Sequence, residues 1–119
     1  MSNVFQQPEY QGQQALLDAI NRNDTALLPS MIIATVLYED DFDFARTACI
    51  RLCSHDNETI RGNAILGFGH LARLFGRQGE QEIALVKRAL HDPSAYVRGQ
   101  ANAAAGDLKH FLGVDVRSP

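Results

Sequence analysis

The chain has 119 residues, of which 45% are hydrophobic and 21% charged, enough apolar material for one domain with its own core. A net charge of −3 without a basic stripe excludes a general nucleic-acid binder. No run approaches the roughly 20 apolar residues that span a bilayer, and the first residues lack the basic start and apolar stretch of a secretory signal. We therefore expect a cytoplasmic protein that binds no membrane.

Residues 11–38 predict a first pair of helices. The segment QQALLDAINR places its leucine and isoleucine side chains on one side of a short helix. The segment NDTALLPSMIIATVLYED predicts a second helix that is capped near Asp24. Its first turn would hold Pro29, because a proline there removes no helical hydrogen bond. We expect residues 1–9, which precede this pair, to be flexible.

Residues 43–75 and 80–112 predict two further pairs. In each, a helix over about 43–54 or 80–90 precedes a longer helix, for which Asp56 or Asp92 would be the N-cap. The longer helices end at glycines, as helices commonly do. No segment alternates apolar and polar residues with a period of two, so we predict no strand. Residues 114–119 are expected to be flexible.

The longer helices of these two pairs are related by an internal repeat. At an offset of 37 residues, 60–76 falls on 97–113 with identities at Arg61/Arg98, Gly62/Gly99, Ala64/Ala101, Gly69/Gly106, Leu71/Leu108 and Gly76/Gly113. One such pair cannot bury both faces of its helices, but about three stacked pairs can. Ile65 and Leu66 become Asn102 and Ala103 in the last pair. This change suits a terminal repeat, whose outer face has no neighbour.

Cys49 and Cys53 lie one helical turn apart, at positions that correspond to Leu85 and Ala89 in the next pair. We interpret them as two free thiols of the core in a reducing compartment. A metal site that combines them with His55 is the alternative, although the second spaced pair of ligands that zinc motifs contain is missing.

A period near 38 residues with an aspartate and then an apolar residue and arginine at the second helix resembles HEAT repeats. The matching residues are Asp56, Ile60, Arg61 and Ala64, and then Asp92, Val97, Arg98 and Ala101. The resemblance implies an all-α, right-handed α-solenoid of about three HEAT-like helix pairs in a single domain. It also implies a structural ladder in which Asp56, Arg61, Asp92 and Arg98 connect neighbouring repeats.

The wider pattern is similar to small bacterial HEAT-like proteins, some of which are immunity proteins of contact-dependent inhibition or other polymorphic toxin systems. This resemblance implies a protein partner, such as a basic toxin domain that the chain would bind and neutralise without chemistry. A HEAT-like regulatory or assembly scaffold is the first alternative, and a HEAT-like lyase or glycosylase is the second. The sequence contains no recognisable catalytic motif and no phosphate-binding loop, and we expect no enzyme activity, cofactor or metal.

The densest charge cluster lies in the segment YEDDFDF and comprises Tyr38, Glu39, Asp40, Asp41, Phe42 and Asp43. It is either a loop with one capping aspartate and solvated acids or a surface for a basic partner, with the two aromatic side chains as anchors. The spacing does not match the twelve-residue calcium loop.

A second candidate surface follows from the repeat, because the second helices of HEAT-like stacks usually line the concave face. A polar strip there would contain Asn63, His70, Arg73, Gln100, Asp107 and His110. An ordinary solvated helix face explains the same residues. Asp107 and His110 also form a nominal acid–base pair, although any polar helix face offers such pairs.

Overall fold

The computed structural model describes residues 9–117, and this part of the chain is all-α, which confirms the predicted all-α class. The six helices are α1 (Gln13–Asn21), α2 (Leu28–Tyr38), α3 (Phe42–Leu52), α4 (Glu58–Phe75), α5 (Glu80–Ala89) and α6 (Ala95–Leu112). The described residues form no strand. None of the helices in this part of the chain is long and apolar enough to cross a membrane. Residues 1–8 and 118–119, which we expected to be flexible, lie outside the described residues.

The N-caps differ in position from the predicted ones. Asn57 caps α4, where its side chain accepts hydrogen bonds from the amides of residues 59 and 60, and Ser94 caps α6. The predicted caps Asp56 and Asp92 are therefore wrong by one and two residues. An N-cap side chain must reach the amides two or three residues ahead. Asp92 lies two residues before the N-cap, so the amide that it reaches is that of Ser94, which lies outside the helix.

Helix ends and the proline agree with the sequence patterns. Gly76 and Gly113 follow α4 and α6 in the left-handed conformation, with φ of 67° and 69°, which glycine adopts without steric cost. Pro29 lies in the first turn of α2. The side chain of Asp24 accepts a hydrogen bond from the amide of Leu27, the residue directly before α2.

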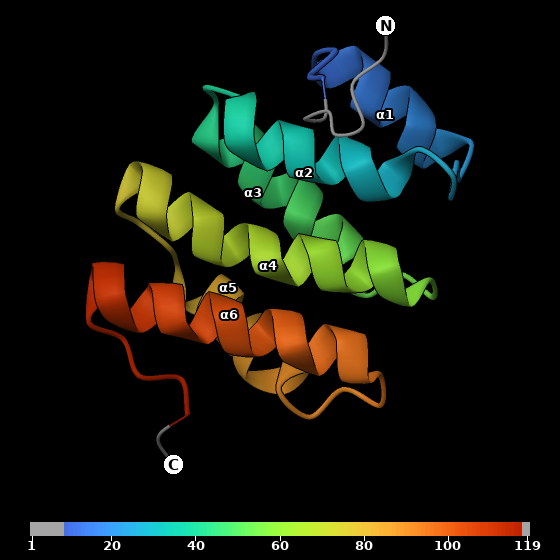
Figure 1. Ribbon diagram of the computed structural model, residues 1–119. Coiled ribbons are helices and arrows are strands. Elements are labelled where there is room, and N and C mark those ends of the chain that lie inside the picture. The colour runs from blue at the N-terminus through green and yellow to red at the C-terminus, as the bar shows by residue number, and fades with distance from the viewer. Residues whose placement is uncertain (1–8, 118–119) are drawn as a thin grey trace, which may run out of the picture.

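Three helices, α2, α4 and α6, lie side by side in one layer, with α3 and α5 behind them and α1 packed on α2 (Figure 1). These three helices are parallel. The start of α4 lies beside the start of α6, where Glu58 accepts a hydrogen bond from Ser94, and Gly69 further along α4 approaches Ala104 further along α6. All three C-terminal ends therefore lie on the same side of the molecule (left in Figure 1).

The core extends through all six helices and is centred on α4, whose Ile60, Phe68 and Leu71 are fully buried. Burying such side chains contributes about 1.5–3 kcal/mol each. Both cysteines are free and buried. A Cβ at Gly67 would lie 2.7 Å from the Cys49 sulfur, so the absence of a side chain there makes room for the thiol.

Residues 114–117, which we expected to be flexible, pack against the rest of the domain. Val116 is buried in the core cluster, and the Arg117 guanidinium donates a 2.9 Å hydrogen bond to the Asn102 carbonyl. Asn102 and Ala103 are exposed, whereas Ile65, the counterpart of Asn102 in α4, is buried. The C-terminal segment thus covers part of the last helix.

Candidate functional site

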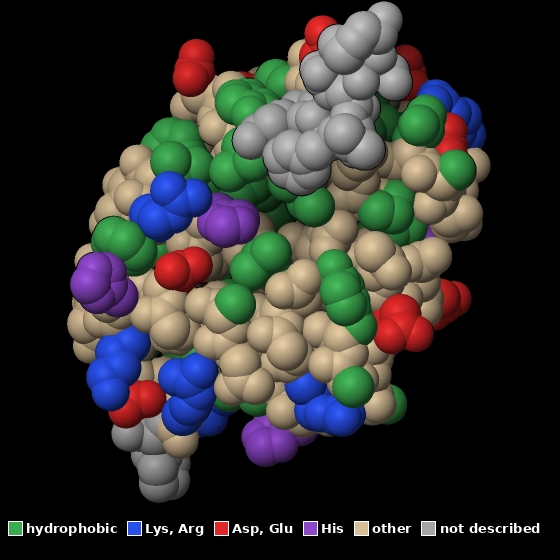
Figure 2. Space-filling view, in the orientation of Figure 1, with side chains coloured by type: hydrophobic (Ala, Val, Ile, Leu, Met, Phe, Trp, Pro, Cys, Tyr) green, Lys and Arg blue, Asp and Glu red, His purple; other side chains and the backbone are tan. Residues whose placement is uncertain are grey.

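The C-terminal ends of the three parallel helices each present one large apolar side chain to solvent. Tyr38 at the end of α2, Leu74 near the end of α4 and Phe111 near the end of α6 are 48%, 44% and 42% exposed. Apolar side chains also appear at this end of the molecule in Figure 2, among basic and histidine side chains (left). We call Tyr38, Leu74 and Phe111 the apolar row.

Of the apolar row, only Tyr38 was among the predicted contact residues; Leu74 and Phe111 match each other in the repeat but were not predicted as candidates. They lie at the same place in equivalent helices, 37 residues apart. Their neighbours Phe75 and Leu112 are the ones that pack partly against the core. Adjacent residues of a helix point in different directions, so when one of two neighbouring apolar residues faces the core, the other faces solvent. The two adjacent apolar residues at the end of each long helix could therefore have indicated one exposed side chain.

Three predicted residues, His70, Arg73 and Asp107, are brought together beside this row. Arg73 donates a 3.3 Å hydrogen bond from Nη2 to Nδ1 of His70. The pKa of His70 is lowered, first by burial and then by the Arg73 charge, while Asp107 acts in the opposite direction. Asp107 of α6 lies against Gly69, the residue before His70 in α4: a Cβ at Gly69 would lie 2.8 Å from an Asp107 carboxylate oxygen. The strip thus contains a compact His–Arg–Asp cluster.

His110 lies at the end of the same helix as Asp107 and is exposed. Its ring makes an edge-to-face contact with the adjacent Phe111, with 4.6 Å between the ring centroids. His110 therefore flanks the apolar row, and it extends the polar surface from the His–Arg–Asp cluster toward the end of α6.

Asn63 does not belong to an exposed strip. It is 5% exposed, donates a 3.0 Å hydrogen bond to the Pro29 carbonyl and accepts a 2.5 Å bond from the Tyr96 hydroxyl. Gln100 donates a 2.8 Å hydrogen bond to the same hydroxyl. These bonds connect α2, α4 and α6, and burial makes their loss costly. The predicted exposed position of Asn63 is corrected to a buried, structural one.

The acidic loop between α2 and α3 divides into engaged and exposed carboxylates. Glu39 accepts hydrogen bonds from the Tyr10 hydroxyl, the Gln13 side chain and the Asp41 amide, and the Tyr10 bond is the largest cause of its lowered pKa. Asp41 is the N-cap of α3, since it accepts a 3.1 Å bond from the Phe44 amide. Both residues thus have structural roles.

Asp40 and Asp43 are exposed in the same loop. Phe42, proposed as a second aromatic anchor, is only 8% exposed. Its ring packs edge-on against Phe75 with 5.3 Å between centroids, and the Arg77 guanidinium lies 4.3 Å above it. Burial between α3 and α4 removes Phe42 from the candidate contact surface and leaves Tyr38, Asp40 and Asp43.

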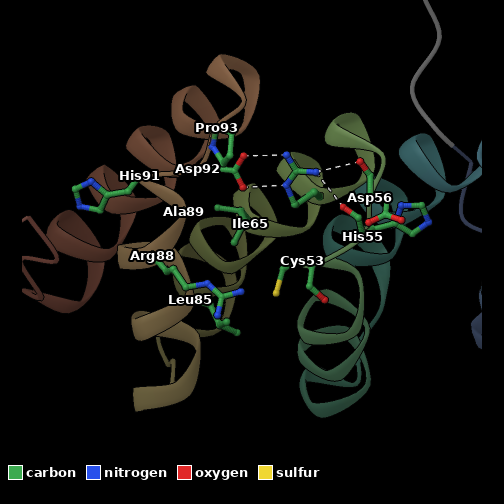
Figure 3. Close-up of a pocket in the computed structure, with 12 residues that line it drawn as sticks. Cys53, His55, Asp56, Ile65, Leu85, Arg88, Ala89, His91, Asp92 and Pro93 are labelled. Atoms are coloured by element: carbon green, nitrogen blue, oxygen red, sulfur yellow. Dashed lines mark hydrogen bonds and ion pairs between the residues drawn. The ribbon is translucent and has the colours of Figure 1, made fainter.

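The ladder residues meet at the junction between helix pairs (Figure 3). The Arg61 guanidinium forms two bonds to the Asp92 carboxylate, of 2.9 and 2.8 Å, and donates to the His55 and Asp56 carbonyls. Arg98 donates in the same way to the carbonyls of residues 92 and 93. Asp56 contributes its carbonyl, and its side chain is exposed.

Two members of the alternative metal site, Cys53 and His55, make other contacts. Within residues 9–117, no three His, Cys, Asp or Glu side chains are grouped so as to hold a metal ion. The Cys53 thiol instead donates to the Ile50 carbonyl, and His55 bonds Asn23 at 2.7 Å.

Comparison with protein-family models, with curated proteins and with solved structures found no match to this chain.

Proposed function

We propose that this chain is a non-catalytic protein-binding module whose partner docks on the C-terminal edge of the α2–α4–α6 layer. One observation supports this most. Of the five large hydrophobic side chains exposed in residues 9–117, Tyr38, Leu74 and Phe111 lie at the C-terminal ends of α2, α4 and α6, whereas Leu27 and Tyr96 lie at the N-terminal ends of α2 and α6. Exposed apolar side chains concentrated on one layer and surrounded by polar ones are typical of interaction surfaces.

The acidic side chains at the α2 end of this edge indicate the chemistry of the partner. Asp40 and Asp43 are exposed beside Tyr38, and a partner with a basic surface would be attracted to them. Toxin nucleases are basic where they hold phosphates. We therefore propose an immunity protein that binds and neutralises a cognate bacterial toxin domain in the cytoplasm.

We also propose that the three helix pairs form a right-handed solenoid of the HEAT-like kind. The parallel register of α4 and α6 and the Arg61–Asp92 bond between consecutive pairs support this arrangement. In a solenoid, equivalent side chains of successive repeats recur along one surface. Leu74 and Phe111 are such a pair, so the proposed surface and the proposed arrangement are consistent.

The test is binding to the toxin domain encoded next to this chain's gene. We expect co-purification that weakens as salt is raised, because exposed charges are screened, and we expect cells that express the toxin domain to survive when the chain is co-expressed. Co-purification with a housekeeping protein and no protection of these cells would favour the scaffold alternative instead.

Variants locate the surface. Tyr38→Ala combined with Asp43→Lys should weaken binding at least about tenfold, since it removes an aromatic anchor and reverses a charge. Glu80→Lys changes charge by the same amount as Asp43→Lys at an exposed position of α5 and should leave the affinity within about twofold. Equal effects of the two variants would refute the assignment of this edge.

A further inference from the structure

A groove opens between the ends of α3 and α5, away from the apolar row (Figure 3). Its volume of about 470 Å³ lies within the roughly 300–1,000 Å³ of small-molecule sites. Its lining comes from the turn after α3, the first half of α4, the second half of α5 and the turn before α6. None of its residues belongs to the proposed docking edge.

The floor and one wall of the groove are aliphatic. Ile65 of α4 and Leu85 and Ala89 of α5 line it, and the Cys53 side chain faces them across the groove (Figure 3). The Cys53 thiol is mostly buried, and this burial is the largest cause of its raised pKa. The groove therefore offers a small apolar surface, to which the half-buried Leu85 contributes most, to the body of a ligand.

The Arg61–Asp92 ion pair lies at the upper edge of the groove (Figure 3). The two side chains are only 18% and 15% exposed, and all three guanidinium nitrogens of Arg61 are used in bonds to Asp92 and to backbone carbonyls. This bond connects α4 to the turn before α6 and so stabilises this edge of the groove without a ligand.

Arg88 is the cation that this arrangement leaves available. Arg22, Arg46 and Arg61 pair with carboxylates, whereas no ion pair is formed by Arg88 within residues 9–117. Its guanidinium extends toward Cys53, while His91 points away from the groove (Figure 3). The Arg88 charge also acts on the Cys53 thiol, where it opposes the effect of burial on the pKa.

We propose that this groove binds a small carboxylate with a short aliphatic body. The carboxylate would accept two hydrogen bonds from the Arg88 guanidinium, a geometry that this group favours. The aliphatic part would lie against Ile65, Leu85 and Ala89. This site is independent of the proposed partner surface, so either proposal can fail without the other.

Titration of the isotope-labelled chain with hexanoate, followed by amide NMR shifts, tests the proposal. Saturable shifts are expected for residues 53–56 and 85–92. Hexanol and hexylamine, which have the same chain length without the negative charge, should bind at least about tenfold more weakly, because a hydrogen bond to a charged group is lost. Absence of saturable shifts, or equal affinity for hexanol, would overturn the proposal.

A pair of variants identifies the cation. Arg88→Gln should lower the affinity for hexanoate about tenfold or more without changing the fold, since Arg88 is exposed. Lys87→Gln removes the same charge from the neighbouring exposed position, which does not line the groove, and should change the affinity less than twofold. Equal losses in both variants would show a general charge effect and contradict a specific site.

Discussion

Arg61 shows how a single side chain can connect two helix pairs. It bonds both oxygens of Asp92, which lies 31 residues later, and the carbonyls that precede its own helix. The pKa of Arg61 is raised and that of Asp92 is lowered, and in both cases their mutual hydrogen bonds are the largest cause. The charged forms of both groups are thus stabilised by one contact that is shielded from water on most sides.

Replacement of Arg61 measures this connection. Arg61→Ala should lower the free energy of unfolding by about 1–3 kcal/mol, because Asp92 and two carbonyls lose a charged partner. Arg98→Ala is the matched control: Arg98 bonds only carbonyls and is exposed, so we expect a loss below about 1 kcal/mol. Urea unfolding of both variants provides the comparison, and equal losses would show that the ion pair adds nothing.

Asp92 also makes stability depend on pH. Its pKa in the folded state is lowered from the ordinary 3.8, so the folded chain favours the ionised carboxylate. The stabilisation from the ionised Asp92 is fully present well above pH 3.8. It is lost as the pH falls through the lower pKa of the folded state. The difference in unfolding free energy between the wild type and Asp92→Asn should therefore be constant near neutrality and shrink below about pH 4.

His70 also makes stability depend on pH, but here the pKa shift is caused chiefly by burial. Its pKa is lowered from 6.5, chiefly by burial and next by Arg73. The stability from its neutral form is present above pH 6.5 and is lost as the pH falls through the folded-state pKa. NMR titration should give a midpoint below 6.5, which Arg73→Gln raises and Asp107→Asn lowers further. Shifts in the reverse directions would contradict the His–Arg–Asp cluster.

At the scale of elements, the close contact between α4 and α6 depends on glycine at one position of the repeat and not at its equivalent. A Cβ at Gly69 would lie 2.8 Å from the Ala104 Cα, a backbone atom that cannot move alone. The equivalent Gly106 has no atom within 4 Å of such a Cβ. The same residue type in the same helix position therefore has different roles in the two repeats.

The corresponding alanine variants should have effects of opposite sign. Gly69→Ala should destabilise by about 1–3 kcal/mol, because the helices must separate. Gly106→Ala should stabilise by up to about 1 kcal/mol, because alanine loses less backbone freedom in a helix. Thermal unfolding of both variants is the measurement, and stabilisation by Gly69→Ala would show that α4 and α6 are further apart than described.

At the scale of the whole molecule, one core cluster includes residues from all six helices and Val116. A continuous core of this kind in a chain of this length favours a single cooperative transition. Cys49 is a probe inside that core: it is fully buried, and burial raises its thiol pKa. It should therefore react with a thiol reagent only when the whole domain opens.

The measurement compares two probes during urea unfolding. The reactivity of Cys49, in a Cys53→Ala background, should rise at the same urea concentration at which helical circular dichroism is lost. A Cys49 that reacts well before this transition would show that α3 opens separately from the rest, and that the molecule does not behave as one unit.

The sequence alone predicted much of the fold, because the information required was local. Apolar spacing of three and four residues, glycines after the long helices and the internal repeat are visible without knowledge of neighbours. The cap positions at Asn57 and Ser94 were missed by one or two residues. Several polar side chains precede each helix, and only the path of the chain decides which one reaches the free amides.

Only the tertiary structure decided which candidate residues are accessible. Phe42 and Tyr38 are aromatic residues of the same acidic segment. Phe42 is covered by Phe75 and Arg77, whereas Tyr38 is exposed. Asn63 is buried for a similar reason, since it bonds groups 34 residues before and 33 residues after it. Periodicity by itself determined the helices and their order, whereas burial depends on which distant segments lie against a residue, and that is set by the packing of all six helices together.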